Sequence, residues 1–190
     1  MKRSKRKNEI YSAAVRLFRE RGYAASSMRD IAERVGIEAS SLYSHISSKE
    51  EILRDICMDC SEMFEAGMKE VLATEGPFLQ KIQALMRLHI DMAINHPSSV
   101  TVFNDEWKHL PPASLEKFLA SRRAYEAAYR NIIKEGMAAG EFAQRSSKVV
   151  FNIIINSTQW LHYYPRKLSK DELEKFERNI FSFIEAGIMS

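Results

Sequence analysis

Apolar residues recur every three or four positions along almost the whole chain, and this spacing constrains the fold more than any other feature. It is the spacing of α-helices with one apolar face, whereas half-buried strands would alternate apolar and polar residues. Proline or glycine stands at most breaks in the pattern, where helices usually end. The sequence therefore predicts an all-α protein without strands. Helices are expected up to Gly22, from Ser27 to Gly36, over a short polar stretch after Gly36, and over about residues 48–73, 79–95, 99–109, 113–139, 147–163 and 169–188.

The stretch GIEASSLYSHISSKEE, residues 36–51, is polar for a segment of a folded helical protein. Two short helices joined across Gly36, the second poor in core residues, match a helix-turn-helix whose second helix enters the major groove of DNA. Ala32 is small enough for the two helices to cross closely, Gly36 can adopt the positive φ of the turn, and Leu42 can fill the core. The hydroxyls expected on the outer face, where they can approach base edges or phosphates, are those of Ser40, Ser41 and Ser44.

The longer segment SSMRDIAERVGIEASSLYSHISSKEEIL resembles the DNA-binding signature of the TetR family of bacterial transcriptional regulators. The resemblance covers about residues 8–54. It implies an N-terminal three-helix DNA-binding domain with a helix-turn-helix over residues 1–47. A larger helical domain for ligand binding and dimerisation is then expected over residues 48–190.

The same resemblance implies a role for individual residues. Ser40 and Ser41 fall at base-facing positions of the recognition helix. Glu38 stands where the family usually has Ser, and Ile46 stands where it has Phe, while Ser40 replaces the common Gly or Ala. Glu38 can accept a hydrogen bond from a cytosine amino group or point away from DNA, so the operator sequence stays open. Contacts to backbone phosphates are implied for Ser27, Arg29, Tyr43, His45 and Lys49.

Positive charge is concentrated at the N-terminal end of the chain. Residues 1–54 contain 12 Lys and Arg against 7 Asp and Glu, which leaves 16 against 18 of the totals of 28 and 25 for the rest. The basic start KRSKRK suits any anionic surface, so the alternative is a helical lipid-binding or redox-sensing protein whose N-terminus contacts membranes. A membrane-surface helix needs exposed Phe, Trp or Leu opposite its charge. The serine-rich helix lacks them, which favours double-stranded DNA as the partner.

Other classes of protein are disfavoured by features that the sequence lacks. No window approaches about eighteen apolar residues, and the basic start lacks the apolar core of a signal peptide, which predicts a cytoplasmic protein without membrane spans. A nucleophile elbow, an HExxH motif and a glycine-rich phosphate loop are all missing, so neither catalysis nor a cofactor is expected. Cys57 and Cys60 lack the further ligands of a metal site and are expected to be buried free thiols, with a redox switch as the alternative.

The last two expected helices have enough apolar surface to pair with a second copy of the chain. Residues 147–163 are apolar nearly all round, and residues 169–188 have a wide apolar stripe that includes Ile184. In proteins that resemble TetR, the last two helices of each subunit form an intersubunit four-helix bundle. A homodimer is therefore expected, with Ile184 in its interface.

Large aromatic and amphipathic side chains in the middle of the chain can line an effector pocket. Residues 104–142 and the segment STQWLHYYP resemble the C-terminal part of TetR-type repressors of lipid and acyl-CoA catabolism. This implies an acyl-CoA or similar ligand, with another apolar small molecule as the alternative. The predicted function is a dimeric repressor that binds a palindromic operator and is released by such an effector. The expected ligand contacts are Met86, His89, Phe103, Trp107, Tyr125, Tyr129 and Trp160, with phosphates met by Arg122, Arg123 or Arg166.

Overall fold

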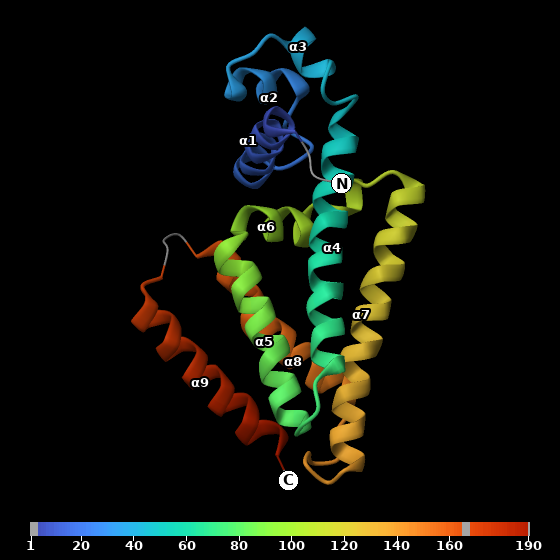
Figure 1. Ribbon diagram of the computed structural model, residues 1–190, viewed down its shortest axis with the longest axis vertical. Coiled ribbons are helices and arrows are strands. Elements are labelled where there is room, and N and C mark those ends of the chain that lie inside the picture. The colour runs from blue at the N-terminus through green and yellow to red at the C-terminus, as the bar shows by residue number, and fades with distance from the viewer. Residues whose placement is uncertain (1–3, 165–167, 190) are drawn as a thin grey trace. The chain divides into compact units, whose positions relative to one another are not determined.

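The computed structural model describes residues 4–164 and 168–189, and within these ranges the protein is helical (Figure 1). The described part has no strand beyond one isolated bridge between Phe142 and Met189. The all-α prediction is confirmed. The elements are α1 (Lys5–Arg21), α2 (Met28–Val35), α3 (Ala39–Tyr43), α4 (Lys49–Ala73), α5 (Phe78–Asn95), α6 (Pro97–Asp105), η1 (Trp107–His109), α7 (Pro112–Ala138), α8 (Ser147–Gln159), η2 (Trp160–Tyr163) and α9 (Lys170–Ile188), where η marks a 3-10 helix.

The helix-turn-helix has the ends that its local sequence predicts. Ser27 caps α2, because its hydroxyl accepts from the Asp30 N–H while the Asp30 carboxylate accepts from the Ser27 N–H. Gly36 ends α2 in the left-handed conformation at φ 73°, which costs little without a Cβ. The turn that follows leads directly into α3. The Ser27 cap and the left-handed Gly36 therefore fix where α2 begins and ends before α3 starts.

The chain divides into two compact units, residues 1–62 with 98–120 and residues 63–97 with 121–190. The first unit includes the start of α4, most of α6 and the start of α7, because Ile52, Val102 and Phe118 are buried with the apolar residues of α1 to α3. It is therefore larger than the segment 1–47 that the sequence assigns to DNA binding. That boundary stays a prediction about function.

The second unit has a separate apolar core, in which α5 lies against α8 and α9. Ile82, Leu85 and Ile90 of α5 are fully buried there, together with Ile154 of α8 and Ile184 of α9. No helix in the described part of the chain is both long enough and apolar enough to cross a membrane.

Candidate DNA-binding and effector sites

The recognition helix α3 and the turn after it, residues 39–46, are anchored by two side chains, and most of the other residues of this segment are exposed. Leu42 and Ile46, four positions apart, are buried in the first unit. Tyr43 is 55% exposed between them. The Ser44 hydroxyl donates to the Ser41 carbonyl at 2.7 Å, which leaves its lone pairs available to a donor. The exposed set contains the residues that the sequence places toward DNA, namely Ser40, Ser41, Tyr43, Ser44 and His45.

Two further residues predicted to meet phosphates lie at the start of α2. Ser27 and Arg29 are both exposed. The hydroxyl of Ser27 also donates to the Asp30 carboxylate, and this hydrogen bond is the main reason that the pKa of Asp30 is lowered. The first turn of α2 is thus held in one conformation while its outer side chains stay accessible.

Lys49 is half-buried, and its ammonium is engaged within the protein. Its Nζ donates to the carbonyl oxygens of Tyr23 at 2.8 Å and Ser26 at 2.7 Å. The same atom lies 4.1 Å from the centroid of the Tyr23 ring. Two of the three donors of this ammonium are therefore used by main-chain oxygens of the turn before α2. The phosphate contact expected from sequence stays a prediction for this residue.

The N-terminal half of α1 is tied to the start of α4 by side-chain hydrogen bonds. Lys7 Nζ donates to Glu51 at 2.9 Å, and the Tyr11 hydroxyl donates to Asp55 at 2.5 Å. Burial opposes ionisation of Glu51, but hydrogen bonds from Ser47 and Lys7 outweigh it and lower its pKa to about 2. This stabilisation is present above the ordinary carboxyl pKa and is lost as the pH falls toward 2.

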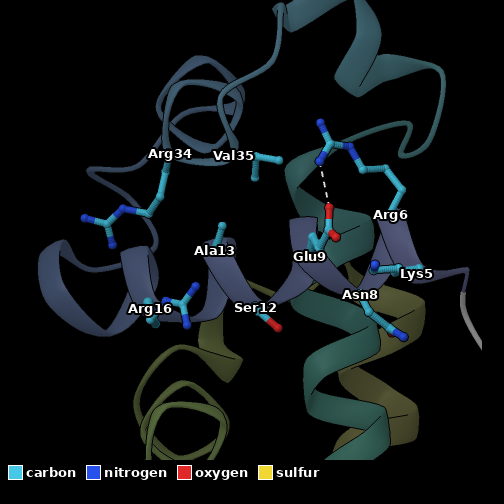
Figure 2. Close-up of a pocket in the computed structure, with 9 residues that line it drawn as sticks. All are labelled: Lys5, Arg6, Asn8, Glu9, Ser12, Ala13, Arg16, Arg34 and Val35. Atoms are coloured by element: carbon cyan, nitrogen blue, oxygen red, sulfur yellow. Dashed lines mark hydrogen bonds and ion pairs between the residues drawn. The ribbon is translucent and has the colours of Figure 1, made fainter.

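A basic groove of about 680 Å³ runs between α1 and α2 in the first unit (Figure 2). Two of its arginines are paired, Arg6 with Glu9 and Arg34 with Glu20, each at 2.6 Å. Sequence reasoning noticed the basic tail but missed Arg16 and Arg34. The signal for Arg16 was present, because residues 5, 8, 9, 12 and 16 recur at the spacing of one helix face. Arg34 lies on α2, and spacing within one helix does not show which other helix it meets. The lining residues are Lys5, Arg6, Asn8, Glu9, Ser12, Ala13, Arg16, Arg34 and Val35.

A string of aromatic rings links four helices in the second unit. Phe64 of α4 stacks on His89 of α5 with ring centroids 4.7 Å apart. The His89 Nε2 lies 2.9 Å from the hydroxyl oxygen of Tyr125 on α7. Tyr129, one turn later, packs edge-on against Tyr125 at 6.3 Å and Phe151 of α8 at 5.4 Å. We call these five residues the ring string.

In the ring string, Tyr129 is buried and His89 and Tyr125 are half-buried, and the polar groups of all three are neutral at physiological pH. Burial lowers the pKa of His89 to about 4 and raises the pKa values of Tyr125 and Tyr129. The Tyr129 hydroxyl has no hydrogen-bond partner among the described residues. An unpaired buried hydroxyl costs about 1–3 kcal/mol. A ligand that supplied a partner here would gain that energy.

The structure brings together only some of the residues expected to contact the effector. Met86 is buried in the same core as Tyr129, and Tyr125 is partly buried against that core. Sequence reasoning missed Phe64 as a member of this cluster. Its signal was the spacing of buried residues at 60, 64 and 68, which puts Phe64 on the inner face of α4.

The other expected effector contacts lie elsewhere. Phe103 and Trp107 pack against Phe118 in the first unit. Trp160 is 45% exposed, and its ring meets Tyr164 and Phe176 rather than the ring string. Arg122 and Arg123 are exposed on α7, and Arg166 lies outside the described residues.

An apolar surface on α8 and α9 is exposed in the single chain. Val149 and Ile153 of α8, four positions apart, are 55% and 52% exposed, and Phe183 of α9 is 72% exposed. Ile184, by contrast, is only 3% exposed and belongs to the core of its own subunit. The prediction that Ile184 lies in the dimer interface is therefore wrong. The apolar stripe of α9 is wide enough to serve two surfaces, and Ile184 is on the inner one.

Cys57 and Cys60 are free and buried in α4. Burial is the main reason that the pKa of each thiol is raised to about 12. A thiol with so high a pKa has almost no thiolate at neutral pH and is a poor nucleophile. The part of the chain that the structure describes contains no group of three or more His, Cys, Asp or Glu placed to hold a metal ion.

Two family models match successive parts of the chain. Residues 10–56 match the model described as "Bacterial regulatory proteins, tetR family", which spans the helix-turn-helix. Residues 75–164 match the model described as "Tetracyclin repressor-like, C-terminal domain". The two matches follow each other in the order that a regulator of this kind requires.

Individual proteins agree with the family models. The HTH-type transcriptional repressor KstR2 of Mycolicibacterium smegmatis is 27% identical over 157 residues, which cover 82% of this chain and 77% of that protein. The solved structure of the ketosteroid transcriptional regulator KstR2 of Mycobacterium tuberculosis matches with a TM-score of 0.91 at 21% identity, over 100% of this chain and 97% of that one. The structure of AibR in complex with isovaleryl coenzyme A and operator DNA matches with a TM-score of 0.82 at 20% identity, over 94% and 97%. These structures show the shared fold.

Proposed function

Since this chain belongs to the TetR family of bacterial transcriptional regulators, we propose that it is a dimeric repressor that a small amphipathic effector releases from a palindromic operator. The observation that carries the proposal is the polar segment formed by α3 and the turn after it, which Leu42 and Ile46 hold while its remaining side chains are mostly exposed. Such a surface suits a hydrated, charged partner. The proposed location is the bacterial cytoplasm, where operator DNA lies, and the function requires no catalytic step.

The proposed DNA contacts divide into two kinds. Ser40 and Ser41 are proposed to meet base edges, where a hydroxyl can donate or accept. The exposed side chains around them are proposed to hold the phosphate backbone, which fixes register without reading sequence. The basic side chains of the groove between α1 and α2 are proposed to add attraction to the phosphates of DNA that does not depend on the DNA sequence. The proposed phosphate contacts are Ser27, Arg29, Tyr43, Ser44 and His45.

The exposed apolar surface of α8 and α9 supports dimerisation through these two helices. Val149, Ile153 and Phe183 are large apolar side chains that a second copy would remove from water. A two-fold dimer presents the same surface from both subunits and so requires a roughly palindromic operator. Its half-sites are expected to be centred about one helical turn apart, or a multiple of it.

The ring string is proposed as the place where the effector binds. Its aromatic faces suit an acyl or other apolar group, and its buried hydroxyls can meet a carbonyl oxygen. AibR, which shares this fold, is described with isovaleryl coenzyme A. We therefore propose an acyl-CoA as the effector class, with the acyl group among Phe64, Tyr129 and Phe151. Because His89 is neutral, a free carboxylate is expected to be disfavoured at this position.

Tyr43→Phe is expected to weaken binding to all operator variants by a similar factor, about tenfold or more, because a hydrogen bond to phosphate carries no base information. Ser41→Ala removes a hydroxyl two residues away and is expected to change the preferred bases instead. Selection from randomised duplexes gives the consensus, and fluorescence anisotropy gives the affinity. The same consensus for Ser41→Ala and the parent would contradict base readout by Ser41. Unchanged affinity for Tyr43→Phe would contradict its phosphate contact.

Effector and operator are expected to weaken each other's binding by one common factor, about 5- to 150-fold, because allosteric coupling is reciprocal. Calorimetry with isovaleryl-CoA, a long-chain acyl-CoA and CoA alone, with and without saturating operator, measures this factor. Tyr125→Phe should lower the affinity for whichever acyl-CoA binds, because it removes the hydroxyl that lies beside His89 Nε2. Tyr164→Phe, the same change at an exposed ring outside the ring string, is the matched control. A ligand whose affinity is identical with and without operator would contradict the proposal.

A further inference from the structure

The turn between α1 and α2, residues 22–26, is held from two sides within the first unit. On one side, Lys49 donates to the carbonyls of Tyr23 and Ser26. On the other side, the Tyr23 ring stacks on the His109 ring of η1 with centroids 5.2 Å apart and planes 26° apart. The Ser26 hydroxyl donates to the Gly22 carbonyl at 2.8 Å, which closes the turn on itself. Tyr23 and Ser26 are both buried.

This turn leads directly into the DNA-contacting start of α2. Ser26 immediately precedes Ser27, the capping residue, and the first turn of α2 holds Arg29. A hydrogen bond to the Ser26 carbonyl therefore acts one residue away from the proposed phosphate contacts. Lys49 is the first residue of α4, so its bonds join the start of α4 to the start of α2. These two helix ends flank α3 in the sequence.

Two of the three N–H donors of the Lys49 ammonium hold the turn, so at most one is left for a phosphate. Hydrogen bonds from a charged donor are each worth about tenfold or more in an equilibrium constant, and two of them hold the Lys49 Nζ against the turn. The Tyr23 ring at 4.1 Å adds a cation–π attraction. Moving Nζ to a phosphate would break these contacts and leave two carbonyl oxygens without this donor.

We infer that Lys49 is a positioning residue, which sets DNA affinity by holding the carbonyls of Tyr23 and Ser26 and thereby orienting the start of α2. The inference rests on the proposed function, because it concerns how this chain binds operator DNA. It assigns Lys49 a part in DNA binding that needs no direct phosphate contact. The positive charge of Lys49 serves the protein's own backbone in this arrangement.

The salt dependence of operator affinity separates positioning from direct contact. A lost phosphate contact reduces the slope of log K against log salt concentration by about 0.9 per contact, whereas a lost positioning residue lowers affinity and leaves the slope unchanged. Lys49→Met, which keeps the apolar stem, is expected to weaken binding about tenfold or more with the parent slope. Arg29→Met, at a proposed phosphate contact, is the reference for a reduced slope. Lys69→Met, at an exposed lysine of the same helix, is the matched control.

Amide hydrogen exchange on the DNA-free protein tests the positioning itself. Lys49→Met should accelerate exchange in the first turns of α2, while amides in the second half of α4 keep their parent rates, and Lys49→Arg should restore part of the lost affinity. A slope reduced as in Arg29→Met, or α2 exchange equal to the parent, would overturn the inference. Global loss of protection would also overturn it, because Lys49 would then serve folding in general. If the parent chain selects no duplex at all, the proposed function itself fails.

Discussion

Phe183→Asp is expected to convert the dimer into a folded monomer that binds its operator at least about a hundredfold more weakly. Phe183 is 72% exposed on α9, so the substitution removes little packing within its own subunit. In a two-fold dimer, both copies of the aspartate would be buried in the interface, and each unpaired carboxylate costs several kcal/mol. A monomer presents one α3 instead of two, and most of the specific affinity comes from reading both half-sites.

The matched control is Ile184→Asp, one residue further along the same helix. Ile184 is buried within its own subunit, so the cost of this carboxylate falls on folding rather than on association. Light scattering measures the dimer, circular dichroism measures helix content and thermal unfolding, and anisotropy measures operator affinity. Phe183→Asp should keep its helix content, whereas Ile184→Asp should unfold at a lower temperature. A Phe183→Asp protein that stays dimeric at micromolar concentration would place the interface elsewhere.

The ends of the helices could be predicted from sequence because their signals are local. Ser27 starts α2 through capping hydrogen bonds, and Gly36 ends it through a left-handed backbone conformation. A few neighbouring residues determine both. The division of α9 between two surfaces could not be predicted in this way. Phe183 and Ile184 are adjacent apolar residues in one wide stripe, and periodicity does not distinguish the core of a subunit from the surface of its partner.

The candidate sites show the same limit. The exposed residues of α3 could be identified because one short helix, with its turn, sets which side chains face outward. The engagement of Lys49 with Tyr23 and Ser26 could not be foreseen, since more than twenty residues separate the partners and only the packing of α1 to α4 brings them together. The aromatic residues of the middle segment were predicted as one group. The structure divides four of them between two cores and leaves Trp160 exposed, because sequence spacing gives the inner face of a helix but not the helices that it meets.

The second large effect is expected on acidification, through His89. Burial lowers the pKa of His89 to about 4, below its ordinary value of 6.5, so the unfolded chain binds a proton between these pH values while the folded chain does not. The free energy of unfolding should therefore fall by about 1.4 kcal/mol per pH unit from pH 6.5 downward, by about 3 kcal/mol in all, and this contribution should level off below pH 4. Above pH 6.5, His89 should contribute no pH dependence.

Urea unfolding followed by circular dichroism from pH 7.5 to 4.5 measures the effect. His89→Gln, which keeps a polar group beside Tyr125, should lose less stability on acidification than the parent, so the difference between the two curves isolates His89 from the carboxylates that also titrate. His96→Gln, at the exposed C-terminal end of α5, controls for the loss of a histidine as such. Parallel curves for the parent and His89→Gln would show that His89 takes up its proton as readily in the folded chain as in the unfolded one. The proposal of a neutral ring string as the effector site would then have to be abandoned.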